Sequence, residues 1–391
     1  MSDMRLIFLA DDFPPEPGGI QTYSYVLARA VSEAGAEVVV VASVQPGSET
    51  VDDAMPCPVV RVATGGGYAA AALKLAAGAE QAATMLGGPP RCLVATKWSP
   101  EGPAAIWAAR TISRPFVLIG HGGEFSRARG QLIKWIVQRT VMRRAALFLA
   151  NSSFTADLFR RAKAPTDRIG IIYGGVRPER FAATDEQVEG LREKYGLADR
   201  RVLVTVSRLV SRKGHEIVLT AMPEILRGAP DAAYLIVGDG PMREGLEEQT
   251  RELGLEDSVV FAGRVADEMI PACYRLCDAL VMPSRRVRGE LAEGFGLAYL
   301  EAAVCGKPSI GTNYGGIPDA IADGETGLLV DTDDVEGLAG AAARLLGDEE
   351  LCARMGRAAR ERALAEFTWE RVAERFLAQV ERISVPTGNE R

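Results

Sequence analysis

The sequence is poor in the residues that build metal sites, disulfide scaffolds and membrane spans. Its 391 residues include only two histidines, and the six cysteines form no C-x-x-C pair. We therefore interpret the cysteines as reduced core residues and expect no metal site. No run of about 18 apolar residues occurs and the chain enters a strand pattern at its start, so we expect neither a membrane-spanning helix nor a signal peptide. These absences favour a cytoplasmic protein.

The chain also lacks a basic character and recurring aromatic residues. The formal net charge is −7 and aromatic residues make up 6% of the chain, so we expect no nucleic-acid partner. Residues 1–178 carry 19 basic and 14 acidic residues (+5), whereas residues 179–391 carry 26 and 38 (−12). This asymmetry predicts two halves with separate roles. The sequence gives no indication of an oligomeric state.

Short apolar runs alternate with helical patterns through both halves, which predicts an α/β protein with parallel sheets. Strands are expected at 5–10, 37–42, 59–63, 92–95, 115–120, 147–150 and 169–172, and then at 202–206, 233–237, 259–262, 279–282, 308–311 and 327–330. The Gly- and Pro-containing segment 173–181 is expected to link a domain at 1–178 to a domain at 179–366. A last helix is expected at about 367–383.

A glycine pair, Gly18 and Gly19, follows the first predicted strand and precedes a helix. Backbone N–H groups at such a position can reach a phosphate. The pattern is not G-x-G-x-x-G, so a nicotinamide cofactor is not indicated. A plain turn that needs a positive φ explains the pair equally well.

A histidine, His121, ends the strand predicted at 115–120 and opens the polar, Gly-containing segment 121–124. A lone histidine is usually structural. Its place at the carboxyl end of a strand, where ligands bind in α/β sheets, favours a functional role here.

A basic loop follows the strand predicted at 202–206. It contains Arg208, Arg212 and Lys213 and leads into a helix at His215. Cations at the carboxyl end of a strand, just before a helix N-terminus, suit a diphosphate. A surface loop that is basic by chance is the alternative.

The most specific string is E-G-F-G-L-A-Y-L-E at 293–301, after the strand predicted at 279–282 and a basic loop at 285–290. Glu293 is expected at or just before the start of a helix, and the eight-residue spacing would put Glu301 on the same side of that helix. Gly294 and Gly296 leave room for a ligand to approach the backbone. A surface helix that carries two glutamates is the simpler alternative.

With its strand and loop, this string resembles the signature of the retaining family 4 glycosyltransferases. That family has the GT-B fold, in which two Rossmann-like domains with parallel sheets face each other across a cleft. The glycine pair, His121, the R-L-x-x-x-K-G loop and the closing helix occur in the family's order. Segment 173–181 departs from the family's N-G-V-D-x-x-x-F, with Gly and Arg in place of Asn and Asp. Residues 282–296 are most similar to bacterial mannosyltransferases that act on phosphatidylinositol or lipid-linked glycans.

The resemblance implies a role for each motif. The first domain would bind the acceptor and the second the nucleotide-sugar donor, without a metal or other cofactor. A GDP-sugar is favoured as the donor and a UDP-sugar is possible. The last helix would cross back to the first domain. The implied catalytic residues are His121, Arg208, Lys213 and Glu293. The implied donor-binding residues are Gly18, Gly19, Arg208, Lys213, Arg264, Val265, Glu293, Gly294, Phe295, Gly296, Leu297 and Glu301.

Two other motifs are interpreted as structural. The segment 238–241, G-D-G-P, comes close to a dinucleotide fingerprint, but Arg243 stands where the third glycine should be. The D-x-D string at 331–333 matches a metal motif of another glycosyltransferase fold. Because a helix is expected from Val335, we interpret Thr332 or Asp333 as its N-cap.

Residues 126–156 contain no acidic residue, and basic and apolar residues alternate over about 127–144. This pattern is typical of a basic amphipathic helix that rests on anionic lipid. A domain helix with a solvated basic face explains the pattern about equally well.

The sequence thus predicts a retaining, metal-independent glycosyltransferase that moves a hexose, with mannose favoured, to a lipid or lipid-linked glycan. The membrane surface would make it peripheral on the inner face of the plasma membrane. A soluble acceptor, a sugar-nucleotide epimerase of the same fold and a non-catalytic sugar-binding protein remain as alternatives.

Overall fold

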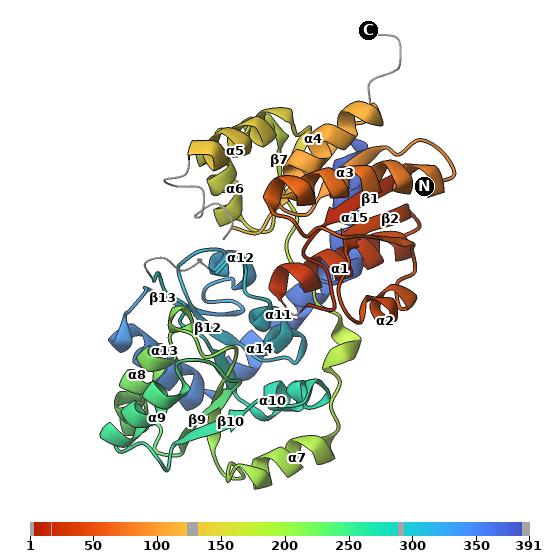
Figure 1. Cartoon of the computed structure of the whole chain (residues 1–391). Coiled ribbons are helices and arrows are strands. Elements are labelled where there is room, and N and C mark those ends of the chain that lie inside the picture. Colours follow the sequence, from red (N-terminus) through yellow and green to blue (C-terminus); the bar gives the residue numbers. More distant parts are fainter. Residues whose placement is uncertain (1–3, 17, 123–131, 288–292, 385–391) are drawn as a thin grey trace. The chain divides into compact units, whose positions relative to one another are not determined.

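The computed structural model describes residues 4–16, 18–122, 132–287 and 293–384. The chain divides into two compact units, which we describe separately (Figure 1). Unit 1 comprises Met1–Gly174 with Trp369–Arg391, and unit 2 comprises Gly175–Thr368. Each unit is built on one parallel sheet flanked by helices, which confirms the predicted Rossmann-like α/β class.

In the described part of unit 1, seven parallel strands form a sheet in the order β3-β2-β1-β4-β5-β6-β7. The strands are β1 (Arg5–Ala10), β2 (Glu37–Ser43), β3 (Val59–Val62), β4 (Cys92–Ala95), β5 (Phe116–Gly120), β6 (Leu147–Ala150) and β7 (Ile169–Ile171). Each lies within a residue or so of its predicted position. The apolar runs are long enough because both faces of a parallel sheet are buried.

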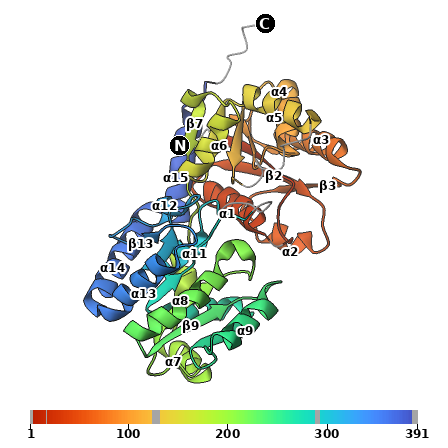
Figure 2. The same ribbon diagram turned by 90° about the vertical axis from the view of Figure 1, so that its left-hand side faces the viewer.

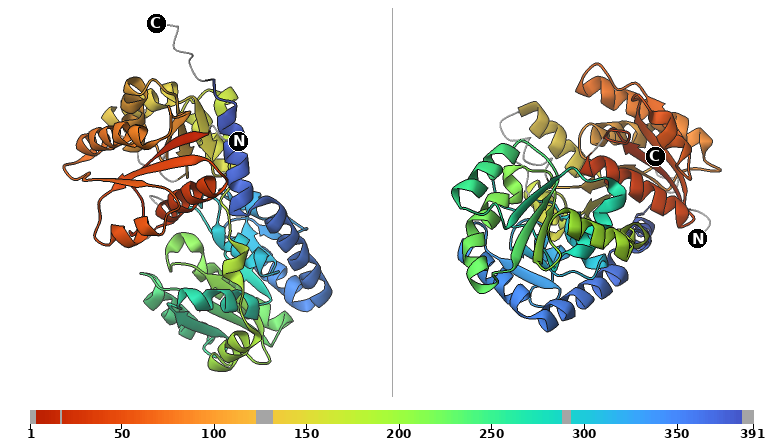
Figure 3. Two further views of the ribbon diagram at one scale, coloured as in Figure 1. Left: turned by 90° about the vertical axis from the view of Figure 1, so that its right-hand side faces the viewer. Right: turned by 90° about the horizontal axis from the view of Figure 1, so that it is seen from below.

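Helices cover both faces of this sheet. They are α1 (Gly19–Glu33), α2 (Ser48–Asp53), α3 (Tyr68–Met85), α4 (Glu101–Thr111), α5 (Leu132–Arg144), α6 (Ser153–Arg161) and α15 (Trp369–Glu381). Successive strand residues point to opposite faces. Leu6 and Phe8 therefore share a core with α1 and α15, whereas Ile7 and Leu9 share one with α3 to α6. The C-terminal helix α15 lies against α1 (Figure 3).

The described part of unit 2 has six parallel strands in the order β10-β9-β8-β11-β12-β13. They are β8 (Arg201–Val206), β9 (Ala232–Val237), β10 (Val259–Gly263), β11 (Ala279–Val281), β12 (Ser309–Thr312) and β13 (Gly327–Val330). The helices are α7 (Asp185–Lys194), α8 (His215–Gly228), α9 (Arg243–Glu252), α10 (Ile270–Leu276), α11 (Leu297–Val304), α12 (Ile317–Ala320), α13 (Val335–Gly347) and α14 (Glu349–Glu366). α8 and α13 lie side by side and pack on one face of the sheet (Figure 2).

The strand order of each sheet reverses at one place. In unit 1 the reversal falls between β1 and β4, and in unit 2 between β8 and β11. In open α/β sheets the loops at such a reversal run in opposite directions, and ligands bind between them at the carboxyl edge. The topology therefore singles out four loops: those after β1 and β4, and those after β8 and β11.

Candidate active site

The loops after β8 and β11 are packed tightly together in unit 2. Gly214 has a φ of +75°, and a Cβ atom there would lie 2.2 Å from the carbonyl oxygen of Pro283. A larger residue at this position would push the two loops apart. The Arg285 N–H also donates to the Arg212 carbonyl at 2.9 Å. Glycine is thus required for the approach that brings the basic loop to the glutamate string.

This approach places Glu293 against two cations of the basic loop. Lys213 Nζ lies 2.5 Å and Arg212 Nη1 3.2 Å from Glu293 Oε2. The Glu293 side chain is 13% exposed. Burial alone would raise the pKa of this carboxyl, but the charges and hydrogen bonds of Lys213 and Arg212 outweigh it and hold the pKa below its usual value. Glu293 is therefore ionised at neutral pH.

A glycine turn holds the backbone of Glu293. The Gly316 N–H donates to the Glu293 carbonyl at 3.0 Å. Gly315 has a φ of +64°, and a Cβ atom there would lie 2.4 Å from the same carbonyl oxygen. The sequence prediction identified the basic loop but missed both this support and the contact from Arg212.

The helix after Glu293 begins later than predicted. α11 starts at Leu297, and Gly296 before it has a φ of +90°. The expectation that Glu293 and Glu301 share one helical face is therefore wrong, because only Glu301 is helical. Residues 294 and 295 form a bend, and the left-handed conformation of Gly296 leads from it into α11. Phe295 is 4% exposed and packs against Phe367, so its side chain belongs to the core.

Glu301 also lies near this cluster. The Tyr274 hydroxyl donates to Glu301 Oε2 at 2.6 Å. Burial raises the pKa of Glu301, although the Tyr274 hydrogen bond and the charges of Arg180 and Lys213 oppose the rise. Lys213 thus acts electrostatically on both glutamates. Tyr274 is a site neighbour that the sequence did not suggest.

The remaining predicted residues of unit 2 lie at more exposed positions. Arg208 is exposed, and the Arg264 side chain is 87% exposed with its Nε 3.8 Å from Asp239 Oδ2. Val265, next to it, is half-buried. The strand order places the loops after β8, β9 and β10 next to one another.

The two motifs interpreted as structural have different outcomes. A Cβ atom at Gly238 would lie 2.0 Å from the Ser207 carbonyl oxygen, which confirms a tight structural turn. The predicted cap at 331–333 is wrong by one residue. Asp334 caps α13 by accepting from the Gly337 N–H, whereas Asp333 has a φ of +63° and pairs with Arg285 at 2.9 Å.

His121, Gly18 and Gly19 belong to unit 1. His121 Nε2 lies 2.8 Å from the Thr96 carbonyl, which can only accept, so this nitrogen carries a proton. Gly18 has a φ of 168°, an extended value that any residue adopts, so the turn explanation for the pair is wrong. A Cβ atom at Gly19 would meet no described atom within 4 Å. A Cβ atom at Gly18 would instead lie 2.1 Å from Gln21 Oε1, so only Gly19 has open space beside its Cα atom.

The structure describes only part of the predicted basic segment. Residues 123–131 lie outside the described residues, as do 288–292 of the other predicted loop, and α5 covers 132–144. The apolar residues of its first half are at least half exposed: Leu132, Ile133, Trp135 and Ile136. Its buried face is made by Gln138, Val141 and Met142. Among the residues described, no helix has the length and apolar character needed to cross a bilayer.

Known proteins resemble the chain over nearly its whole length. Residues 18–175 match the glycosyl transferase 4-like domain, and residues 187–362 match the glycosyl transferases group 1 family. A GDP-mannose-dependent alpha-(1-6)-phosphatidylinositol monomannoside mannosyltransferase of Mycobacterium tuberculosis is 33% identical, with 94% of this chain and 96% of that protein covered. The protein of the same description from Mycolicibacterium smegmatis is also 33% identical, over 93% and 95%.

Solved structures agree with the fold. Anabaena Alr3699/HepE in complex with UDP has a TM-score of 0.81 at 24% identity, and covers 97% of this chain and 100% of its own. This likeness supports the GT-B architecture. The full-length relatives and the two matching domains show that the chain is a glycosyltransferase of the group 1 family, with a glycosyl transferase 4-like domain before the group 1 domain.

Proposed function

We propose that this enzyme transfers mannose from GDP-mannose, with retention of configuration, to a phosphatidylinositol mannoside or a related lipid-linked glycan. The relatives that carry this activity in their names match nearly the whole chain, including both units. The resemblance of residues 282–296 to mannosyltransferases of this kind points the same way. A soluble acceptor or an epimerase activity would not need the exposed apolar side chains of α5.

One arrangement carries the mechanism: the largely enclosed Glu293, 13% exposed, held by Lys213 and Arg212 at the switch point of unit 2. The ion pair keeps a carboxylate next to an ammonium group. Such a pair can bind both the diphosphate and the sugar of a nucleotide-sugar. Lys213 and the exposed Arg208 would bind the diphosphate by charge-assisted hydrogen bonds. Glu293 would accept hydrogen bonds from the hydroxyls of the sugar and stabilise positive charge at its anomeric carbon.

The reaction then runs on one face of the sugar. The bond between the anomeric carbon and the diphosphate oxygen breaks, and its electron pair leaves with GDP. An acceptor oxygen forms the new bond from the same side, and its proton passes to the leaving diphosphate oxygen. Arg208 and Lys213 would neutralise the charge that develops on the diphosphate, which replaces a metal ion.

The other predicted residues complete the donor site. Glu301, held by Tyr274, would accept from the ribose hydroxyls, and the backbone at Arg264 and Val265 would contact the base. The backbone of Gly294, Phe295, Gly296 and Leu297 would line the donor. In unit 1 the backbone of Gly18 and Gly19 would meet the diphosphate, and His121 would lie beside the sugar.

The acceptor is assigned to a membrane surface because of α5. Four apolar residues of its first half are exposed, and Lys134, Arg143 and Arg144 are exposed on the same helix. A helix that is merely solvated would present polar residues there. Anionic lipid accounts for both features, because apolar side chains enter the interface and each basic residue adds about 1 kcal/mol.

Product analysis tests the proposal. The enzyme is incubated with GDP-mannose and phosphatidylinositol monomannoside in anionic vesicles, and the glycolipid product is identified by mass spectrometry and anomeric NMR. An α-linked mannosyl product is expected. Transfer only to soluble acceptors, or conversion of the donor without any acceptor, would replace this function by one of the alternatives.

Vesicle sedimentation tests the membrane surface separately. Binding to anionic vesicles at low salt is expected, and it should weaken as salt screens the charges within about 10 Å. Arg143→Glu with Arg144→Glu should reduce binding by about tenfold or more while GDP affinity stays unchanged. Arg160→Glu with Arg161→Glu on α6 is the matched control. If the wild-type protein does not bind these vesicles, α5 is a domain helix with a solvated face.

A further inference from the structure

The switch point of unit 1 holds a second cluster of charged residues, which the donor site does not use. Asp11 and Asp12 follow β1, and Lys97 and Glu101 follow β4. Lys97 Nζ forms an ion pair with Asp12 Oδ2 and lies 3.8 Å from Glu101 Oε1. The Asp11 N–H donates to the same Glu101 oxygen at 3.0 Å. Residues from both sides of the strand-order reversal therefore meet.

Glu101 is unusual because it is completely buried. Its Oε2 atom has no hydrogen-bond partner among the described residues, and a buried carboxyl oxygen without a partner is costly. Burial raises the pKa of Glu101 to about 8, against the opposing charge of Lys97. The carboxyl is therefore neutral at pH 7. Strongly shifted carboxyl groups cluster at functional sites, and this one lies at a switch point, where α/β sheets bind ligands.

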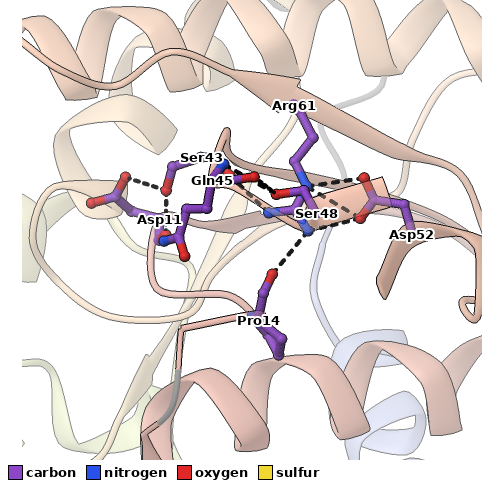
Figure 4. Close-up of polar contacts among 7 residues, drawn as sticks. All are labelled: Asp11, Pro14, Ser43, Gln45, Ser48, Asp52 and Arg61. Carbon is purple, nitrogen blue, oxygen red and sulfur yellow. Dashed lines mark hydrogen bonds and ion pairs between the residues drawn. The ribbon is translucent and has the colours of Figure 1, made fainter. Parts of the chain in front are cut away.

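The loop that carries Asp11 and Asp12 is also fixed from its other side (Figure 4). The Ser43 hydroxyl donates to the Asp11 carbonyl at 2.5 Å and to Asp11 Oδ1 at 3.1 Å. Arg61 donates to the Pro14 carbonyl at 2.9 Å and pairs with Asp52 at 2.7 Å. Its guanidinium lies over the Phe13 ring. Asp12 is thus presented from a rigid loop, which is what a binding residue needs.

We infer that Asp12 and Lys97 form the acceptor-recognition site of unit 1, which binds neighbouring hydroxyl groups of a cyclitol or sugar ring, and that Glu101 positions both residues. A carboxylate accepts hydrogen bonds from one hydroxyl while the ammonium donates to the oxygen of the next. The side chains of Asp12 and Lys97 are 31% and 12% exposed, so both reach the surface with little freedom to move.

The charge of the cluster selects the ligand. With Glu101 neutral, two carboxylates face one ammonium, so the site carries a net negative charge. An anionic phosphate is repelled, whereas an uncharged polyol ring is not. The inference rests on the proposed function for the acceptor's identity, and assigns the ring of the acceptor, not its phosphate, to Asp12 and Lys97.

Acceptor kinetics test this site. Asp12→Asn and Lys97→Met should each raise the KM for phosphatidylinositol monomannoside by at least tenfold, while the GDP dissociation constant stays within twofold. Lys74→Met on α3 and Asp157→Asn on α6 change the same charges in unit 1 and should leave both quantities unchanged. Unchanged acceptor KM in both Asp12→Asn and Lys97→Met would overturn the inference.

Glu101 is tested by a pair of variants. Glu101→Gln keeps a neutral group that accepts from the Asp11 N–H, so acceptor KM should stay within threefold of wild type. Glu101→Ala should raise acceptor KM as Asp12→Asn does, with GDP affinity retained. Equal acceptor KM in the two variants would contradict the positioning role of Glu101. If Glu101→Ala does not fold, the kinetics of Asp12→Asn and Lys97→Met still test the acceptor site.

A binding measurement separates this inference from the proposed function. Saturation-transfer NMR with myo-inositol and methyl α-D-mannopyranoside needs no turnover. Transfer to at least one polyol that is lost in Asp12→Asn, and not displaced by inorganic phosphate, is expected. If the wild type transfers no mannose, the proposed function fails, and the NMR measurement alone then tests the polyol site. Polyol signals that persist in Asp12→Asn would overturn the inferred site.

Discussion

The two switch points of this glycosyltransferase each bury a glutamate beside a lysine, yet the two carboxyl groups are in opposite states. Glu293 in unit 2 receives two cations, and their charges hold its pKa below the usual value despite burial. Glu101 in unit 1 shares one lysine with Asp12, so burial dominates and raises its pKa to about 8. Two cations lie within hydrogen-bond distance of Glu293, whereas Glu101 has one lysine at 3.8 Å and two neighbouring aspartates that raise its pKa further.

This difference matches the ligands assigned to the two sites. An ionised carboxylate with cations around it suits a donor that carries a diphosphate and develops positive charge at its sugar. A neutral carboxyl beneath a carboxylate–ammonium pair suits an uncharged ring. The same topology, a crevice at the carboxyl edge of a parallel sheet, is thus adapted to two substrates by the local balance of charge.

The largest effect is expected from removing the cation of the donor site. Lys213→Ala should lower turnover by about two orders of magnitude or more, because a charge-assisted partner of the diphosphate contributes roughly 2–4 kcal/mol in the transition state. Arg208→Ala should act in the same direction. Steady-state kinetics with GDP-mannose measure both, with Lys194→Ala as the control. Near-normal turnover in both variants would remove the diphosphate site from unit 2.

The two glutamates of unit 2 should separate turnover from binding. Glu293→Gln should reduce kcat by about tenfold or more, because its contact strengthens as charge develops on the sugar. Glu301→Gln should instead weaken binding of GDP itself, since it removes an acceptor for the ribose at a cost of roughly 1–3 kcal/mol. Calorimetric GDP titrations and single-turnover rates distinguish the two. Loss of GDP binding in Glu293→Gln with an intact single-turnover rate would exchange their roles.

The pH dependence of stability should differ in sign between the switch points. The pKa of Glu101 is raised on folding, so its favourable contribution is complete below about pH 4.5 and is lost as pH rises towards about 8. The charged and titratable groups that face it are Lys97, Asp11, Asp12 and Tyr68. Glu101→Gln should therefore become more stable relative to wild type with rising pH, by at most about 1.4 kcal/mol per pH unit.

Glu293→Gln provides the contrast. The pKa of Glu293 is lowered on folding, so its contribution is present at neutral pH and is lost as pH falls through its folded pKa. This variant should be less stable than wild type at pH 7, and the gap should narrow in acid. Thermal unfolding between pH 4 and pH 9 measures both trends. Parallel curves for the two variants would show that the carboxyl groups do not differ in protonation.

The smallest effect is expected from metal removal. In the proposed mechanism Arg208 and Lys213 would supply the positive charge for the leaving diphosphate, so turnover in EDTA should stay within about twofold of the untreated enzyme. Turnover is compared before chelation, after it, and with Mg²⁺ or Mn²⁺ added back. A strict requirement for either ion would mean that the donor site of unit 2 needs a cation beyond its own side chains.

The strands were predictable because each is a short apolar run in a sheet buried on both faces. The helices were less predictable. For example, α7 and α14 are charged, amphipathic segments that carry no motif, and they were not predicted. The start of α11 was misplaced by four residues. Helical periodicity does not show where a glycine with positive φ delays a helix. The cap of α13 is Asp334 and not Asp333, because Asp333 forms an ion pair with Arg285.

The sequence by itself determined the fold class, the family and the motifs that carry Lys213, Glu293 and Glu301. Each of these depends on local order along the chain: apolar runs, glycines at turns and charges after strands. Only the tertiary structure decided which charges meet. Lys213 and Glu293 are 80 residues apart and Asp12 and Lys97 are 85 apart. Glu101 resembles an ordinary first-turn glutamate until packing buries it, because desolvation depends on neighbours that no local pattern specifies.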